Sequence, residues 1–286
     1  MKHFSIGVMS DSFRLGLREG LRKAAQVGAQ GVQIYAVSGE MAPENLSKGA
    51  RRELRDFISD LGLEVSALCG DPGGHGFAVA KDNPRRIELS KKILDLALDL
   101  GTQVVTTHIG VVPADGPSHP RWGIMADACD QLGRYADSVG AYFAVETGPE
   151  PSERLRRFLD GLGSRGVRVN FDPANLHMVI GEDIPAAVRT LAPYIVHTHA
   201  KDGDRYKACD PEQVYGMFAQ DGIEGIQIHD YFMEKPLGKG QLDWTAYLNA
   251  LSEVGYTGYL TIEREVGSDP ETDIREAVAF LRGLGN

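Results

Sequence analysis

Short apolar segments alternate with longer amphipathic segments along the chain. Several short segments, such as VVTTH and YFAVE, are continuously apolar and rich in β-branched and aromatic residues. This composition is typical of strands that are buried on both faces of a parallel sheet. We predict eight strands: Phe4–Met9, Gly31–Tyr35, Glu64–Leu68, Gln103–His108, Tyr142–Glu146, Arg168–Phe171, Ile195–His199 and Tyr259–Glu263.

The amphipathic segments between these strands predict helices. The clearest is Pro84–Leu100, in which Ile87, Leu94 and other apolar residues recur every three or four positions. Asn83 is the expected N-cap of this helix and Gly101 its C-terminal stop. Further helices are predicted at Leu15–Val27, Pro43–Leu61, Pro120–Val139, Ser152–Leu162, Ile184–Leu191, Trp244–Val254 and Glu271–Leu284.

Eight strands that are each followed by a helix indicate an α/β fold, a single (β/α)₈ TIM barrel over residues 1–286. An open, doubly wound sheet is the alternative. That fold favours a GxGxxG turn after the first strand, whereas this chain has MSDSFRLG. One long loop, Gly203–Gly240, follows the seventh strand, and in a barrel it would overhang the mouth where active sites lie.

The composition of the chain limits the classes of function that we expect. The net charge of −10 disfavours nucleic acid as a partner, because phosphate binding depends on lysine and arginine. The three cysteines form no CxxC pair, which is typical of a reducing compartment. Neither a signal peptide nor a run of about 18 apolar residues is found. We therefore expect a cytoplasmic protein that acts on a small molecule without membrane contact.

Four potential metal ligands stand at the ends of predicted strands: Glu146, Asp172, His199 and Glu263. Barrel closure would gather them at one end of the axis. Three carboxylates in a partly dry pocket repel one another unless a cation compensates. Oxygen ligands with one nitrogen suit a single divalent ion, Mn²⁺ first, with Mg²⁺, Co²⁺ or Zn²⁺ as alternatives. Taken one at a time, each acid could instead be a helix cap, and the histidine a core residue.

Other residues are candidates for substrate contact. His108 ends the fourth strand, and His197 and Lys201 flank His199 on the same face of the seventh. Lys201 could stabilise a substrate oxygen or pair with a neighbouring carboxylate. Arg205 could clamp a hydroxyl or phosphate, or be a solvated loop residue. Trp122, after the fourth strand, is a candidate for the pocket wall.

The segments VETG, NFDPANL, HTHAKDG, PLGKGQLDW and GYTGYLTIERE resemble the sugar phosphate isomerase/epimerase family of xylose isomerase-like barrels. This superfamily also contains ketose 3-epimerases, inosose dehydratases and endonuclease IV. The resemblance implies that Glu146, Asp172, His199 and Glu263 are the metal ligands. It also implies that Glu146 and Glu263 are the acid/base pair, which moves a proton through a metal-stabilised enediolate.

Some positions depart from that pattern. Asn175 stands where the ketose epimerases carry a histidine, and Ser152 where they carry a second substrate glutamate. Arg205 falls where they keep a substrate arginine, and we count Asn175 among the substrate contacts. The segment HDYFMEKPLGKG lacks the DxH pair of endonuclease IV.

We therefore expect a metal-dependent isomerase or epimerase of a keto-sugar or a related polyhydroxy carbonyl compound. A lyase of the same fold is the alternative, either an inosose-type dehydratase or a 3-keto-glycoside eliminase. An endonuclease IV-like phosphodiesterase and a non-catalytic sugar-binding barrel are less favoured. The resemblance also implies a homo-oligomer, a dimer or a tetramer.

Overall fold

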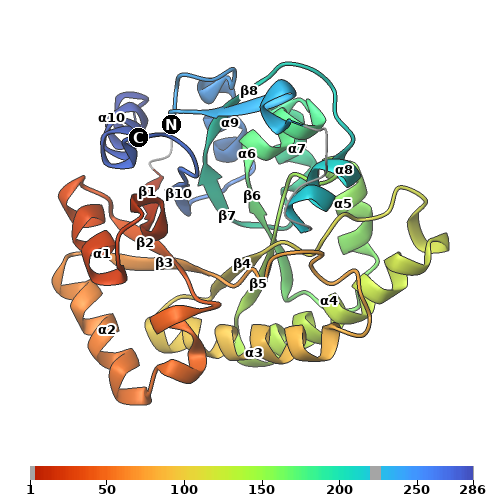
Figure 1. The fold of residues 1–286 in the computed structure, drawn as a ribbon, viewed down its shortest axis with the longest axis horizontal. Coiled ribbons are helices and arrows are strands. Elements are labelled where there is room, and N and C mark those ends of the chain that lie inside the picture. Colours follow the sequence, from red (N-terminus) through yellow and green to blue (C-terminus); the bar gives the residue numbers. More distant parts are fainter. Residues whose placement is uncertain (1–3, 220–226, 286) are drawn as a thin grey trace.

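The computed structural model describes residues 4–219 and 227–285, and its centre is a closed barrel of eight parallel strands (Figure 1). Around the barrel the strand order is β1-β10-β7-β6-β5-β4-β3-β2, so closure joins β1 to both β2 and β10. The eight strands are β1 (Ser5–Met9), β2 (Gly31–Tyr35), β3 (Glu64–Cys69), β4 (Val104–Thr107), β5 (Tyr142–Glu146), β6 (Val167–Phe171), β7 (Ile195–Ala200) and β10 (Tyr259–Ile262). This confirms the predicted (β/α)₈ barrel, with strand bounds that move by at most one residue.

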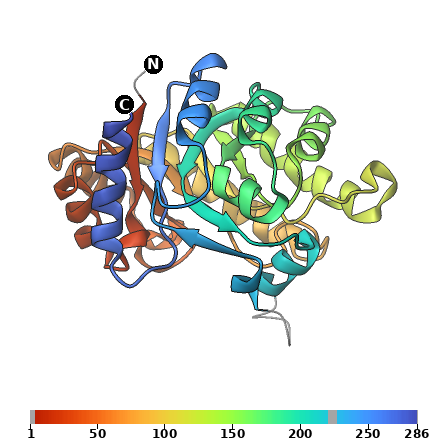
Figure 2. The ribbon, with the colours of Figure 1, turned by 90° about the horizontal axis from the view of Figure 1, so that it is seen from above.

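Helices surround the barrel and bury their apolar faces against it (Figures 1 and 2). The strands are buried on both faces because side chains fill the barrel interior while the helices cover its exterior. The outer helices are α1 (Leu17–Gln26), α2 (Lys48–Asp60), α3 (Asn83–Leu100), α4 (Pro120–Val139), α5 (Ser152–Asp160), α7 (Ile184–Leu191), α9 (Trp244–Glu253) and α10 (Pro270–Gly283). A short helix, α6 (Pro173–Asn175), continues into a π-helical turn at Leu176–Ile180.

Two helix starts differ from the prediction. Asn83 is the first residue of α3 rather than its N-cap, a position that Asp82 takes. Asn83 is buried, and its side-chain amide donates to the carbonyl of Phe77, which fixes the preceding loop. The predicted helix Pro43–Leu61 begins as a separate 3₁₀ turn, Pro43–Asn45, and α2 starts only after Ser47, whose hydroxyl accepts from the N–H of Ala50. At Gly101 the prediction is confirmed, because this residue ends α3 with a φ of 92°.

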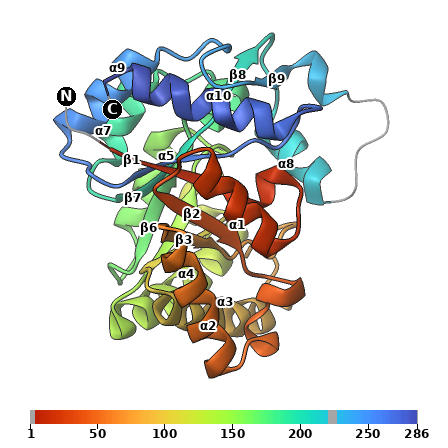
Figure 3. The same cartoon turned by 90° about the vertical axis from the view of Figure 1, so that its left-hand side faces the viewer.

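The long segment after β7, which was predicted as a loop, contains secondary structure. Its strands β8 (Asp202–Arg205) and β9 (Phe232–Lys235) pair antiparallel, and α8 (Pro211–Ala219) lies between them in the chain. Figure 3 shows β8 and β9 near the top of the view, with α2 at the bottom. These elements contribute one wall of the cavity described below.

Asp202 fixes the base of this segment. Its carboxylate accepts from the backbone N–H groups of Gly238 at 2.9 Å and Gly240 at 3.2 Å, and from the Trp244 indole at 3.0 Å. Gly238 has a φ of 77°, a conformation that favours glycine. The segment PLGKG is therefore a turn held by a buried carboxylate. None of the described helices is long and apolar enough to cross a membrane.

Candidate metal centre

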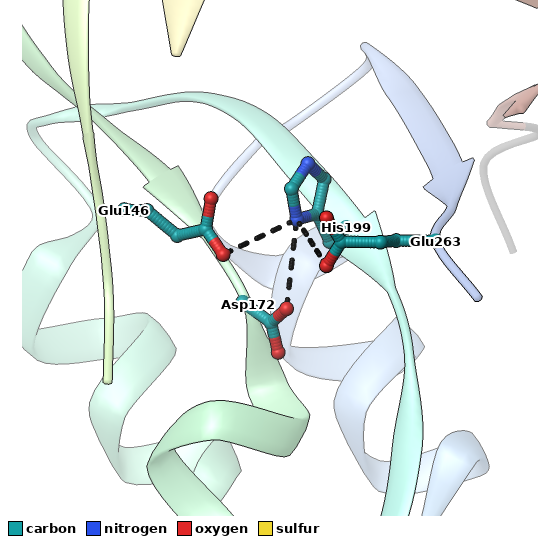
Figure 4. A group of neighbouring side chains, drawn as sticks. All are labelled: Glu146, Asp172, His199 and Glu263. Carbon is teal, nitrogen blue, oxygen red and sulfur yellow. Dashed lines mark ion pairs between the residues drawn. The ribbon is translucent and has the colours of Figure 1, made fainter. Parts of the chain in front are cut away.

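The four expected ligands meet at the carboxyl ends of their strands (Figure 4). His199 Nδ1 lies 3.3 Å from Glu263 Oε2, 3.5 Å from Glu146 Oε1 and 3.5 Å from Asp172 Oδ2. One ligand atom from each residue lies within 4.8 Å of every other. In Figure 4 Glu146 and Glu263 approach from opposite sides, with His199 and Asp172 between them. This is the convergence that the strand ends predict.

The arrangement fits a divalent cation because two buried atoms at its centre have no hydrogen-bond partner. These are His199 Nδ1 and Asp172 Oδ2, which face each other. Buried polar atoms are normally satisfied, so this pair requires a third group. A metal ion would take lone pairs from both and offset the repulsion among the three carboxylates. Since the ligand set has three oxygens and one nitrogen and no sulfur, it suits Mn²⁺, Mg²⁺ or Co²⁺ as well as Zn²⁺.

Neighbouring amides select the tautomer of His199. Its Nε2 lies 3.0 Å from Gln33 Oε1, an acceptor, and 3.2 Å from Asn170 Nδ2, which also donates to Glu146 Oε2. Gln33 Nε2 donates to Thr106 Oγ1 at 2.9 Å, so the Gln33 oxygen faces the ring and makes the shorter contact. The proton therefore belongs on Nε2, and Nδ1 keeps its lone pair toward the cluster. Burial alone would lower the pKa of His199, but the charges of Glu263 and Glu146 raise it well above its ordinary value. The negative charge that would attract a proton to Nδ1 equally attracts a metal ion.

Glu146 is oriented by side-chain amides. Asn175 Nδ2 donates to Oε1 at 3.0 Å, and Asn170 Nδ2 donates to Oε2 at 3.2 Å. His108 Nε2 lies 3.8 Å from Oε1, and Asp71 holds the other ring nitrogen at 2.9 Å. Burial alone would lower the pKa of His108, but Glu146 and the hydrogen bond to Asp71 raise it to about 10.

Glu263 has a cationic neighbour instead. Lys201 Nζ donates to Glu263 Oε2 at 3.0 Å and also contacts the carboxylate of Glu265. Burial alone would raise the pKa of Glu263, but Lys201 and His199 hold it well below its ordinary value. The two glutamates thus have different surroundings, one amide-rich and one with an ammonium group, although both face the same centre.

A cavity of about 1090 Å³ opens above the cluster. Glu146 and Glu263 lie in its wall together with His108, Asn175 and Lys201, so a ligand in the cavity can reach all five. Asp172 and His199 lie below, only 0% and 1% exposed, and are not part of the wall. Two carboxylates therefore serve both the cluster and the cavity, while the other two ligands serve the cluster alone.

Comparisons with known proteins agree with this fold. The family model of the xylose isomerase-like TIM barrel matches residues 21–284. The chain belongs to this family. Among curated proteins, an L-ribulose 3-epimerase of Mesorhizobium japonicum is 24% identical over 243 residues, which are 79% of this chain and 70% of the relative.

Solved structures of other xylose isomerase-like barrels share the fold over nearly the whole chain. A xylose isomerase domain protein from Planctomyces limnophilus is 25% identical, with a TM-score of 0.79 over 99% of this chain and 97% of that one. A structure of an L-ribulose 3-epimerase is 19% identical, with a TM-score of 0.72 over 99% of this chain and 94% of that one. These similarities support the fold. The substrate of this chain has to be inferred from its own residues.

Three expected substrate contacts lie away from the cavity wall. His197 shares the inward face of β7 with His199 but lies one layer deeper and is 1% exposed. Its Nδ1 donates to Asn170 Oδ1 at 2.8 Å, and its Nε2 accepts from the Thr261 hydroxyl at 2.9 Å. Burial, together with the charge of His199, lowers its pKa well below the ordinary value. His197 is a neutral support of the barrel floor, so its expected contact with substrate does not fit its position.

Trp122 and Arg205 also lie outside the cavity wall. The Trp122 ring packs edge-on against Phe158, with 5.1 Å between ring centroids, in the interface of α4 and α5. It is a core residue of the helical layer. Arg205 lies in β8, and its guanidinium packs against Gly181 outside the wall.

Gln33, Thr106 and Asn170 support the cluster and were missed from the sequence. Each is fully buried and points into the barrel beneath the ligands. The available signal was a polar residue inside an apolar strand, as in GVQIY and VRVNF. A buried amide requires partners, so such interruptions indicate a polar network in the barrel interior.

Proposed function

We propose that this chain is a divalent-metal-dependent isomerase or epimerase of a keto-sugar or a related polyhydroxy carbonyl compound. The observation that carries the proposal is the placement of Glu146 and Glu263. They flank one centre from opposite sides and both reach the cavity. Two carboxylates on opposite faces of one substrate carbon can remove a proton from one face and return it to the other. The curated relative, an L-ribulose 3-epimerase, supports this reaction class.

Glu146, Asp172, His199 and Glu263 would hold the metal ion, with Mn²⁺ as the first choice. When bound, the metal would supply a Lewis acid for the carbonyl and neighbouring hydroxyl oxygens of the substrate. The protein side chains carry the proton. One of the two glutamates takes it from the carbon beside the carbonyl, and the other delivers a proton to the opposite face. Lys201, beside Glu263, and His108, beside Glu146, would stabilise negative charge on substrate oxygens.

A lyase is the second candidate, and His108 is the residue that favours it. The imidazole lies in the cavity wall beside Glu146, with Nδ1 anchored by Asp71. A positioned imidazolium could protonate a leaving hydroxyl or alkoxide, after a glutamate has removed the proton next to the carbonyl. Both reactions begin with the same proton abstraction and differ only in whether a group leaves.

The test is solvent exchange. The Mn²⁺-loaded protein is incubated in D₂O with a panel of ketoses, inososes and 3-keto-glycosides, and the products are examined by NMR and mass spectrometry. Deuterium at a single carbon, without loss of water or aglycone, supports the isomerase/epimerase. Deuterium accompanied by loss of water or aglycone supports the lyase. Exchange that is absent across the whole panel, with metal shown to be bound, contradicts both.

A further inference from the structure

The cavity above the metal centre is larger than a sugar requires. At about 1090 Å³ it lies just above the roughly 300–1,000 Å³ typical of sites that bury drug-sized ligands. A hexose at the metal centre would contact the polar floor formed by Glu146, Glu263, Lys201 and His108 and leave the outer part of the cavity empty. The side chains that line the rest of the cavity therefore indicate the chemistry of the remaining part of the substrate.

Besides its charged and polar residues, the cavity lining includes apolar side chains from several segments of the chain: Val111, Met178, Val179, Val214, Ile228 and Phe232. Ile228 and Phe232 are half-buried, so part of each side chain is available to a ligand. Two of the few large apolar residues that are strongly exposed also line this cavity, Met233 at 40% and Val266 at 47%. Apolar side chains in the same cavity as the polar groups of the cluster fit a ligand with one polar end and one apolar end.

The wall offers no free cation for a phosphate group among the described residues. Its lysine and arginine side chains each pair with a carboxylate: Lys201 with Glu263 and Glu265, Arg264 with Glu234 and Asp273, Arg121 with Glu212, and Lys235 with Asp204. Its three histidines each lie beside an aspartate: His75 by Asp82, His108 by Asp71, and His229 by Asp230. Phosphate sites normally present unpaired arginine or lysine groups, so a phosphorylated substrate would meet carboxylates here.

From these two observations we propose that the substrate is an unphosphorylated carbonyl sugar that carries an apolar substituent, such as an aryl or alkyl aglycone. The sugar ring lies on the floor between Glu146 and Glu263. The substituent lies against Ile228, Phe232 and Val214 on the segment that follows β7. The inference rests on the proposed function for the placement of the sugar, and on the apolar wall and the paired cations for the rest.

Binding can be tested without turnover, because parent glucosides lack the reactive carbonyl. The Mn²⁺-loaded full chain is titrated by calorimetry with methyl β-D-glucopyranoside, its phenyl counterpart and methyl β-D-glucopyranoside 6-phosphate. Burial of the phenyl ring should give at least about tenfold tighter binding than the methyl glycoside. The 6-phosphate should bind at least about tenfold more weakly than the methyl glycoside, because of the surrounding carboxylates. Equal affinity of the methyl and phenyl glycosides, or tighter binding of the phosphate, overturns the proposal.

Single substitutions test which residues produce the preference for the phenyl glycoside. Phe232→Ser and Ile228→Ser should each reduce the phenyl-to-methyl preference by at least about threefold and leave the affinity for the methyl glycoside unchanged. Leu15→Ser, which removes an exposed apolar side chain outside the cavity, is the control and should leave the preference intact. If the two cavity variants change the oligomeric mass in light scattering but not the preference, the wall contacts a second copy of the chain and the proposal is wrong.

The result separates this inference from the proposed function. Proton exchange with keto-sugars is measured independently in D₂O. Exchange without a phenyl preference retains the metal-dependent isomerase and overturns the apolar substituent. A phenyl preference that is lost in Phe232→Ser, without exchange on any keto compound, supports the binding class and contradicts the proposed chemistry.

Discussion

Gln33 Oε1 lies 3.0 Å from His199 Nε2, so an amide on β2 sets the tautomer of an imidazole on β7. The two residues are far apart in the chain and meet only because the barrel closes. Because the bond places the proton on Nε2, the opposite nitrogen is left to bind a metal ion. Gln33 is in turn held by Thr106, which makes the geometry of the cluster dependent on buried side chains beneath it.

We predict that Gln33→Leu weakens metal binding. Without the acceptor, His199 can place its proton on Nδ1 and rotate, and loss of such a supporting bond costs about 10- to 100-fold in metal affinity. Titration calorimetry with Mn²⁺ measures the change, and circular dichroism checks the fold. Gln103→Leu is the matched control, because Gln103 is exposed and distant from the cluster. Equal Mn²⁺ affinity in Gln33→Leu and the wild type would contradict the role of Gln33.

Removal of the metal should cost activity and stability together. Without the metal, the three carboxylates lie close together, and His199 Nδ1 and Asp172 Oδ2 have no hydrogen-bond partner. An ion present at 100 times its Kd stabilises the folded state by about 2.7 kcal/mol. In a chain of this size that corresponds to a loss of roughly 5 °C or more in Tm after EDTA treatment. Differential scanning calorimetry measures the loss, and added Mn²⁺ should restore both Tm and activity. A Tm that EDTA leaves unchanged would mean that no ion stabilises the cluster.

Glu146→Gln and Glu263→Gln should abolish turnover while the fold survives. Each substitution keeps the size of the side chain but removes the group that accepts and delivers the proton, and proton transfer by a positioned side chain contributes about 10²- to 10⁴-fold. Rates are measured at saturating Mn²⁺, with bound metal quantified, so that a weaker ligand is not mistaken for a lost base. Glu276→Gln on the exposed face of α10 is the control. Full activity in either cluster variant, with metal bound, would remove the acid/base pair from the mechanism.

The sequence predicted the features that follow from strand periodicity. Glu146, Asp172, His199 and Glu263 lie within one residue of the carboxyl ends of their strands, and in any closed parallel barrel such positions converge. The cluster was therefore foreseen together with the fold. The depth of each side chain along the barrel axis was harder to predict. His197 and His199 share one face of β7, but a step of two residues along the strand moves a side chain from the metal cluster to the layer beneath it.

Residues between the strands were less predictable. Trp122 opens a helix after β4, and its ring turns toward Phe158 in the helical layer, because packing between α4 and α5 decides its rotamer. Arg205 lies on a strand, β8, that exists only through its pairing with β9. Pairings formed by distant segments are not encoded in local periodicity. Gln33 and Asn170 show the opposite case. Each is a visible polar interruption in an apolar strand, but the sequence does not show that their hydrogen-bond partners are His199 and Glu146.

Glu150 provides a prediction about pH outside the metal centre. It is 1% exposed, and its carboxylate accepts from the N–H of Val112 at 2.9 Å. Burial raises its pKa from 4.5 to about 7, although the hydrogen bond and Arg154 oppose the shift. Between these two values the folded protein binds a proton that the unfolded chain has released. The stability contributed by the protonated group is therefore full below pH 4.5 and is lost as the pH rises through about 7.

Glu150→Gln should remove that dependence, because the amide keeps an acceptor for Val112 and never ionises. We expect the Tm of the variant, relative to the wild type, to rise between pH 5 and pH 8 by about 2 °C or more. Calorimetric scans at several pH values measure this difference. Glu153→Gln is the matched control, since Glu153 is exposed on α5 and should show no such trend. A constant difference in Tm between Glu150→Gln and the wild type over this range would show that Glu150 is already ionised in the folded protein at pH 5. In that case the bond to Val112 and the charge of Arg154, rather than burial, would determine its protonation.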